Sequence, residues 1–452
     1  MLRSPAHGNR RYVKLTWIGL TTALAGALAL VSPARAELVA EEASSAALAV
    51  GPQFRPYAAY IKGCELHVAR RPPSGWRDQR VACLSPEPPG SYAVAGVKVD
   101  RRGLASVLVW SGRRIVLFRQ GPRTWKALPV AHPGIFGAPG LTLDRRGLPA
   151  VAYTLWRAPS DTYLRLVTIG RGGRLVSTPI TRNGFPASLG PPAAAPVLVG
   201  RRLHVVQGYG GTVVDWGPTG RTWEGQFLFA TRSGAVSGPV GGHFARGTLH
   251  AALTLDVPQA GELNVVHLTS RTTQQSAVVF RHARFVSLTV PRTGPEVAAY
   301  DFAQLSSGIV YAGLVATPGL DVEIDGRIDG YAAIAEGSRY ILLNHSPGLE
   351  FYAVPALLPV AVKLEARQEP DGTTSLTGTV AGQGRGEVVL YREAPGQRTL
   401  IGRVPLSADG AFALVDPAPQ QDTAYRAVYH ETTTGLPYAA LLRTPCCASP
   451  LR

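Results

Sequence analysis

Short runs of β-branched and aromatic residues, separated by Gly, Pro and Asp, cover the chain from about residue 54 onward. Four such runs follow one another at 93–99, 105–110, 114–118 and 124–129. Runs of this length bounded by turn residues predict β-strands, and long helical patterns are few. The pattern therefore predicts an all-β protein.

The four-strand unit repeats with a nearly constant period. Strand-like segments begin at residues 65, 114, 163, 212 and 262, in steps of 49, 49, 49 and 50, and a looser copy begins at 321. The phrase Asp100-Arg101-Arg102-Gly103-Leu104 also returns at 144–148. This period, with four strands in each repeat, predicts a β-propeller of about six blades over residues 54–355. The first repeat shows no innermost strand, so we expect the C-terminal strand of the propeller to complete the first blade.

Two further features of the repeats have structural interpretations. Trp76, Trp125 and Trp223 recur in the same register, and we expect them to pack between blades. Asp100 and Asp144 are expected to hold hairpin turns through their side chains.

Residues 360–444 contain seven further short strand patterns after a Pro-rich join. That number of strands is typical of an immunoglobulin-like β-sandwich. The phrases at 376–380, 388–392, 408–412 and 425–429 resemble the Ig-like modules of secreted bacterial proteins. The resemblance implies a spacer or adhesion unit, with Tyr425 packed as a corner tyrosine and Asp409-Gly410 as a hairpin turn. Residues 445–452 are expected to form a terminal tail.

The N-terminal segment predicts export. Basic residues precede an apolar run at 15–31, and Ala34-Arg35-Ala36 fits a cleavage site, so we interpret residues 1–36 as a signal peptide. The mature protein is expected to be secreted or extracellular, without a membrane anchor after cleavage. An oxidising compartment suits a disulfide between Cys64 and Cys83.

The formal net charge is +16, and the chain has only five lysines among its 46 basic residues. A basic protein can attract nucleic acid or acidic polymers. The arginines form no long runs, so we interpret them as scattered over turns and expect no nucleic-acid partner. An extracellular polysaccharide or a surface protein is the expected partner.

One segment has the composition of a cation site. Residues 321–329 resemble a calcium loop of some propellers, with carboxylates at Asp321, Glu323, Asp325 and Asp329. The alternative is a half-buried strand that ends in an Asp-Gly hairpin. Apart from this calcium, the sequence suggests no cofactor.

The architecture predicted for the repeats is similar to that of sialidases, but their Asp-box pattern S-x-D-x-G-x-x-W is absent, so no catalytic residues are carried over. The loops between second and third strands, and those between blades, share one face, where binding residues of propellers tend to lie. Candidate ligand-binding residues on that face are Trp156, Asp161, Tyr209, His132, Arg182 and Phe185.

Two functions fit the sequence. The first is a secreted or cell-surface binding or adhesion protein for a carbohydrate or protein ligand. The second is a carbohydrate-active hydrolase or lyase, which needs two carboxylates near the propeller axis, such as Asp161 and Asp215. We favour binding, because the motifs of familiar propeller enzymes are missing.

Overall fold

The structure is a computed structural model. It describes residues 37–84, 92–131, 134–158, 161–181, 192–258, 262–270, 276–291, 294–305, 308–317, 320–324, 327–335, 339–345, 348–354, 360–394, 397–420, 423–432 and 435–443. These residues form strands, with two helical turns, η1 (Pro52–Phe54) and η2 (Arg171–Gly173). Within these ranges, no helix is long and apolar enough to cross a membrane. The prediction of an all-β protein is confirmed.

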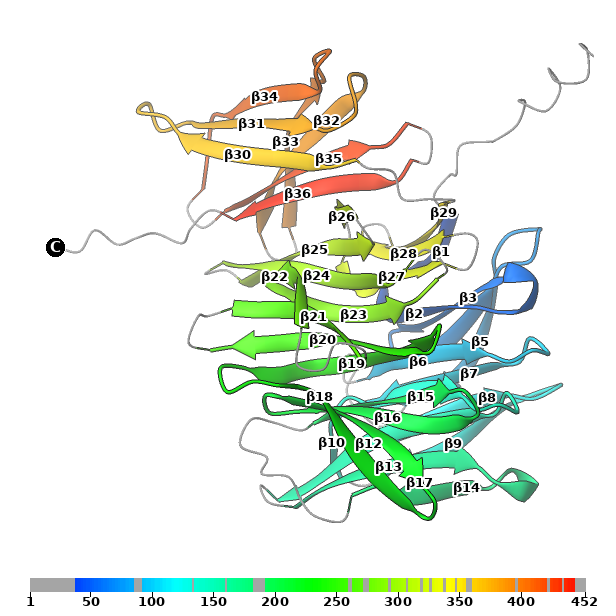
Figure 1. The fold of residues 1–452 in the computed structure, drawn as a ribbon. Helices are drawn as coiled ribbons and strands as arrows, with labels where there is room; N and C mark the ends of the chain where they lie inside the picture. Colours follow the sequence, from blue (N-terminus) through cyan, green and yellow to red (C-terminus); the bar gives the residue numbers. More distant parts are fainter. Residues whose placement is uncertain are drawn as a thin grey trace, which may run out of the picture.

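Consecutive strands form separate antiparallel sheets, each built outward from a first strand (Figure 1). The first sheet contains β2 (Ala43–Val50), β3 (Pro56–Lys62), β4 (Glu65–Arg70) and β5 (Arg77–Cys83). The second contains β6 (Ala93–Val99), β7 (Ala105–Trp110), β8 (Ile115–Gln120) and β9 (Trp125–Ala131). The third contains β11 (Gly140–Leu143), β12 (Pro149–Ala158), β13 (Asp161–Ile169) and β14 (Leu175–Pro179), and β10 (Ile135–Phe136) also pairs with β12.

The same pattern continues to residue 354. The fourth group is β15 (Ala193–Val199), β16 (Arg202–Tyr209), β17 (Thr212–Thr219) and β18 (Thr222–Ala230). The fifth is β19 (Ala235–Ala245), β20 (Thr248–Val257), β21 (Glu262–Thr269) and β22 (Ser276–Arg281). The sixth is β23 (Ala283–Thr289), β24 (Glu296–Leu305), β25 (Gly308–Thr317) and β26 (Leu320–Ile324), and the last is β27 (Arg327–Ala335), β28 (Arg339–His345), β29 (Gly348–Val354) and β1 (Glu37–Glu41). The described strands thus form seven groups, one more than the six repeats expected.

The first strands of successive groups lie against one another and close a ring. β2 contacts β6, the contacts continue through β11, β15, β19 and β23 to β27, and β27 contacts β2. A closed ring of four-stranded antiparallel sheets is the architecture of a β-propeller, in which few sheet edges stay open.

The ring is closed by the N-terminal strand. β1 pairs with β29 from Glu37 opposite Phe351 to Glu41 opposite Gly348, while β2 is the innermost strand of the first sheet. The expected closure, in which a C-terminal strand completes the first blade, is therefore wrong. Arg71 of the first sheet also donates to both carboxylate oxygens of Glu37, with Nε 2.6 Å from Oε2, which ties β1 to the sheet next to its own.

The 49-residue period marks the third strand of the first five sheets. The segments that begin at 65, 114, 163, 212 and 262 correspond to β4, β8, β13, β17 and β21, as expected, although β8 begins one residue later, at Ile115. The looser copy at 321 does not fit this register, because β26 is a fourth strand and β25 is the third. The period therefore identifies the first five sheets and misplaces the strands that follow.

The recurrent tryptophans pack between neighbouring sheets, as expected. The Trp76 ring meets Phe351 edge-on at 5.1 Å, in a cluster shared by the first and last sheets. Trp125 packs on the cluster between the first and second sheets, and Trp223 on the one between the third and fourth. These side chains therefore stabilise the ring by burying apolar area between sheets.

The repeated Asp-Arg-Arg-Gly-Leu phrases form the predicted turns. Asp100 Oδ1 accepts the backbone N–H groups of Arg102 at 2.8 Å and Leu104 at 2.9 Å. Asp144 Oδ1 accepts those of Arg146 at 2.8 Å and Leu148 at 2.9 Å in the same way. One carboxylate thus satisfies two turn donors in each β6–β7 and β11–β12 hairpin.

The tail, from residue 362 to 443, has two sheets that share a buried core. One has the order β30-β31-β34 and the other β36-β35-β32-β33. Their bounds are β30 (Val362–Gln368), β31 (Thr374–Val380), β32 (Glu387–Ala394), β33 (Gln397–Pro405), β34 (Ala411–Asp416), β35 (Ala424–His430) and β36 (Pro437–Arg443). Tyr425 is buried, and its hydroxyl donates to Asp416 Oδ2 at 3.0 Å. Gly410, at φ +82°, makes the expected turn, but the turn joins strands of different sheets, so the hairpin prediction is wrong.

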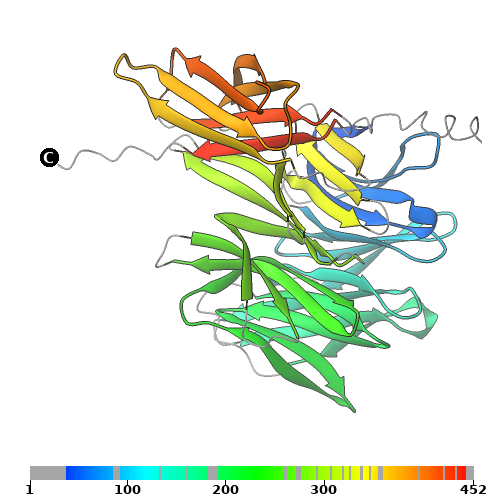
Figure 2. The same ribbon diagram turned by 45° about the horizontal axis from the view of Figure 1, so that its top comes forward.

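The second tail sheet continues into the propeller. β36 pairs with β26 through Tyr438 and Ile324, so one eight-stranded sheet runs from β23 to β33 (Figure 2). Arg426 is fully buried, with Nε 2.5 Å from Glu393 Oε1 and Nη2 3.0 Å from Oε2. Successive residues of a strand face opposite sides, so this ion pair lies on the face opposite the core residue Tyr425.

Candidate functional site

The first strands of the ring enclose a cavity of about 440 Å³. Segments of β2, β6, β15, β19 and β23, together with residues 138–141 at β11, supply most of its wall. The cavity therefore lies on the propeller axis, and six sheets contribute to it.

Small residues shape this wall. A Cβ atom added at Gly140 would lie 2.8 Å from both the carbonyl oxygen of Ala194 and the Cα of Ala195. At Gly241, an added Cβ would lie 2.4 Å from Cζ of Phe285. Real Cβ atoms do not approach other heavy atoms this closely, so at Gly140 the neighbouring first strands can pack only because the residue is glycine, and at Gly241 a side chain would displace the Phe285 ring.

The residues that line the cavity carry two classes of polar group, those with a partner inside the protein and those without one. Some are used within the fold: Ser45 Oγ accepts the Val94 N–H at 3.0 Å, and Thr254 Oγ1 accepts the N–H of Phe285 at 2.8 Å. Two others, Trp110 Nε1 and Ser287 Oγ, are buried and have no partner among the described residues. Buried polar atoms without partners are rare in folded proteins, which makes these two groups candidates for ligand contacts.

The charged residues in the wall are basic. Lys98 and Arg284 line the cavity, and both are exposed. No aspartate or glutamate is among the described residues that line it. The wall can therefore donate hydrogen bonds, but it presents no pair of carboxylates for acid–base chemistry.

The structure describes three of the six binding residues that were predicted from the loops. Trp156 lies half-buried on β12, and Asp161 begins β13 in the same hairpin. Tyr209 ends β16 in the corresponding hairpin of the next sheet, and burial raises the pKa of its phenol. Neither Trp156 nor Tyr209 lines the axial cavity. His132, Arg182 and Phe185 lie outside the described residues, so the binding role of this face stays a prediction.

The segment predicted to bind calcium belongs to two sheets. Asp321 and Glu323 lie on β26 and Asp329 on β27, whereas Asp325 is outside the described residues, as are the side chains of the other three. Where side chains are described, no group of three or more His, Cys, Asp or Glu residues could hold a metal ion. Calcium binding at 321–329 stays a prediction.

Cys64 and Cys83 are neighbours at the turn and edge of the first sheet. Their Sγ atoms lie 2.9 Å apart and both residues are exposed as free cysteines. Cys64 directly precedes Glu65, which is opposite Cys83 in the β4–β5 pairing. The fold thus brings the two thiols together, and their oxidation to a disulfide stays a prediction.

The sequence carries a signal for the axial cavity in the first strands of the repeats, away from the loops. The first strands are rich in Ala and Gly, as in Ala193-Ala194-Ala195 and Gly241-Gly242. Side chains this small are poor at filling a core, and their recurrence at the start of several repeats indicates strands that crowd around an axis.

Comparison with known proteins gives no family. No protein-family model matches the chain, and no curated protein matches it. Among solved structures, prolyl oligopeptidase B from Galerina marginata, bound to a 35mer substrate, is 10% identical with a TM-score of 0.40 over 75% of this chain. The match spans 55% of the oligopeptidase.

Two further structures are similar over most of their own length. YCF48 bound to D1 peptide is 12% identical, with a TM-score of 0.42, over 71% of this chain and 95% of that protein. A mutant of the Aleuria aurantia lectin, in complex with Fucα1-6GlcNAc, is 10% identical, with a TM-score of 0.37, over 72% of this chain and 99% of the lectin. These scores are too low to carry a function from any of the three proteins to this chain.

Proposed function

We propose that this protein is a binding protein, a seven-bladed β-propeller followed by an immunoglobulin-like sandwich, that holds its ligand in the axial cavity. The closed ring of first strands supports the blade count. The two tail sheets, with three and four strands around one core, support the sandwich. The pattern of residues 1–36 supports export of the protein.

The unpartnered donors in the cavity carry the proposal. Trp110 lies on the second sheet and Ser287 on the sixth, so the two residues line the cavity from different sheets of the ring, and each has a buried polar atom without a partner among the described residues. An indole N–H only donates, and a hydroxyl both donates and accepts. A ligand with hydroxyl or carbonyl oxygens would satisfy both groups, which favours a carbohydrate or a peptide segment. The volume of about 440 Å³ is within the usual range of small-ligand sites, about 300–1,000 Å³.

The charged residues that line the cavity favour binding over hydrolysis. Glycoside hydrolysis needs two carboxyl groups about 5–10 Å apart, and the described wall of the cavity has none. Asp215, one of the carboxylates considered from the sequence, instead pairs with His204, with Oδ1 3.1 Å from Nδ1. Asp215 does not line the cavity.

A substitution that fills the cavity tests the proposal. Gly96 lines the cavity, and an added Cβ there would meet only Cβ of Leu141, at 3.6 Å. Gly96→Leu should therefore fold and block the ligand. Ala127→Leu, on the exposed edge strand β9, is the matched control.

Both variants and the unchanged protein should be incubated with panels of glycans and peptides, and retention and released products scored by mass spectrometry. Retention that Gly96→Leu abolishes and Ala127→Leu preserves, without released sugar, supports binding in the cavity. Released oligosaccharides would show an enzyme, and retention unaffected by Gly96→Leu would place the ligand elsewhere.

A further inference from the structure

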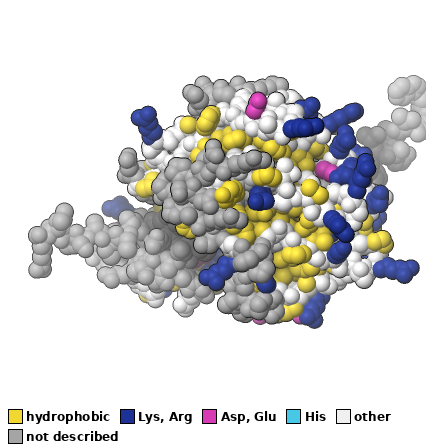
Figure 3. Space-filling model, turned by 90° about the horizontal axis from the view of Figure 1, so that it is seen from below, with side chains coloured by type: hydrophobic (Ala, Val, Ile, Leu, Met, Phe, Trp, Pro, Cys, Tyr) yellow, Lys and Arg dark blue, Asp and Glu magenta, His cyan; other side chains and the backbone are white. Residues whose placement is uncertain are grey.

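The exposed arginines of the propeller gather on one face. In antiparallel four-stranded sheets that radiate from a ring, the hairpins between first and second strands all lie on one face, together with those between third and fourth strands. Each first hairpin of the first five sheets carries one or two exposed arginines, at or beside the turn. Figure 3 shows Lys and Arg side chains gathered along one side of the molecule, with few acidic ones. The interpretation of the arginines as scattered is therefore wrong for these hairpins.

The acidic residues of these five hairpins are too few to neutralise the face, because there are two aspartates and eight exposed arginines. The aspartates are Asp100 and Asp144, and each accepts the backbone N–H groups of its own turn. The third-to-fourth hairpins add Arg123, Arg171 and Arg221, which are exposed as well. The opposite face has fewer arginines among the described residues, with Arg113 and Arg232 in exposed turns.

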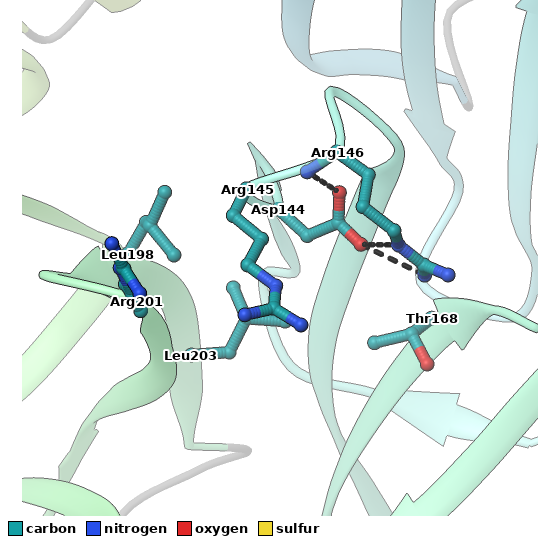
Figure 4. Close-up of a pocket in the computed structure, with 7 residues that line it drawn as sticks. All are labelled: Asp144, Arg145, Arg146, Thr168, Leu198, Arg201 and Leu203. Carbon is teal, nitrogen blue, oxygen red and sulfur yellow. Dashed lines mark hydrogen bonds and ion pairs between the residues drawn. The ribbon is translucent and has the colours of Figure 1, made fainter.

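A pocket of about 300 Å³ lies within this basic face, between the β11–β12 and β15–β16 hairpins (Figure 4). Arg146 is used within the protein, since Nε lies 3.0 Å from Asp144 Oδ2 and Nη2 donates to the Ile169 carbonyl at 2.9 Å. Arg145 and Arg201 are exposed, and neither makes a hydrogen bond or ion pair with the described residues. Two guanidinium groups therefore remain for a ligand.

The rest of the pocket is partly apolar. Leu198 and Leu203 line it beside the hydroxyl-bearing Thr168, and Figure 4 shows Arg145 extending over Leu203. Guanidinium groups bind carboxylates through two parallel hydrogen bonds, and aliphatic side chains pack on the C–H face of a sugar ring. This combination suits one acidic sugar residue.

We propose that this pocket binds a uronic acid residue of an acidic polysaccharide, with Arg145 and Arg201 holding the carboxylate and Leu198 and Leu203 contacting the sugar ring. The arginines of neighbouring hairpins then meet the next carboxylates of the polymer. This site lies outside the axial cavity and does not depend on the function proposed for it.

Other polyanions fit this face less well. Proteins that bind single-stranded nucleic acid stack the bases on aromatic side chains, and no aromatic residue is among the described residues that line the pocket. Stable attachment to a membrane surface uses inserted apolar side chains as well as basic ones, whereas Phe54 is the one large apolar side chain of the five first hairpins that is strongly exposed.

The test is binding of oligogalacturonate to the purified protein, measured by calorimetry at two salt concentrations. Arg145→Gln with Arg201→Gln should weaken binding at least about tenfold, because each removes a charge-assisted contact. Arg113→Gln with Arg232→Gln, on the opposite face, is the matched control and should change the affinity less than about twofold. Thermal unfolding of both double variants checks that they fold.

Three comparison ligands complete the test: a neutral glucan, duplex DNA and anionic phospholipid vesicles. Tight binding of oligogalacturonate that rising salt weakens, and that only the first double variant loses, supports the proposal. Equal loss in both double variants, or no binding of oligogalacturonate, overturns the site. Stronger binding of DNA or vesicles overturns the ligand class. Gly96→Leu should leave this binding unchanged, which separates it from the axial site.

Discussion

Acid should destabilise this protein through two partly buried histidines of the fifth sheet, His243 and His267. His243 on β19 is opposite His250 on β20, and His250 Nδ1 lies 3.1 Å from Nε2 of His267 on β21. The rings of His250 and His267 are stacked, with centroids 5.3 Å apart. Burial, then nearby Lys98 and His250, lower the pKa of His243 to about 4, and burial and then His250 lower the pKa of His267 to about 4.

The sign and size of the effect follow from these values. The unfolded chain binds a proton at each of these two histidines near pH 6.5, whereas the folded protein does so near pH 4. Between these pH values the unfolded state holds more protons, so the free energy of unfolding falls as the pH falls from 6.5 toward 4. Each pKa unit corresponds to about 1.4 kcal/mol. At pH 5 the free energy of unfolding should therefore be lower than at neutral pH by about 2 kcal/mol for each histidine, or about 4 kcal/mol for both.

Urea unfolding between pH 7 and 5, followed by tryptophan fluorescence, measures this loss. Carboxylates stay mostly ionised in that range, so the histidines dominate the change. His243→Gln with His267→Gln should flatten the pH dependence, whereas His430→Gln, an exposed residue of β35, should retain it. An unchanged slope in the double variant would refute the assignment.

Three other substitutions test the fold. Arg71→Ala should lower the free energy of unfolding by about 1 kcal/mol and speed amide exchange in β1, because Glu37 loses its link to the first sheet. Equal exchange rates in β1 of the variant and the unchanged protein would contradict this. Digestion of the air-oxidised protein should yield a peptide that links Cys64 to Cys83. Cys64→Ser should lower the free energy of unfolding by about 3 kcal/mol relative to the oxidised protein. Two free thiols in the mass spectrum would exclude the bond. Arg426→Leu should cost about 3 kcal/mol or more, measured by thermal unfolding, because it leaves a buried carboxylate with one partner fewer.

The sequence predicts the repeating part of the fold better than its ends. The 49-residue period identified five third strands, because the strands and loops of each of the first five sheets add up to a nearly constant length. The sequence did not predict which strand closes the ring, and the reason is local. β1 and β2 are separated by Glu42 alone, which has φ +56°, and a glutamate carries no turn signal. Two strands of different sheets therefore look like one segment in the sequence.

The binding residues were harder to predict than the strands. Loop length and aromatic content led to Trp156 and Tyr209 on one face, but a cavity depends on how closely first strands approach the axis, which only the ring defines. The arginine face was missed because neighbours in sequence need not share a face. Arg113 and Arg123 are ten residues apart, yet their turns lie at opposite ends of β8.

The Asp-Arg-Arg-Gly-Leu turns separate structural from functional residues. In the second copy, Asp144 holds two backbone N–H groups and Gly147 adopts φ +75°, so these two positions account for the turn. Arg146 adds a contact to Asp144 and to the neighbouring strand. Arg145 contributes nothing visible to the turn, and any soluble residue would serve the fold there. A guanidinium group at this exposed position lines one pocket together with Arg201, which costs electrostatic repulsion, and an anionic ligand would offset that cost.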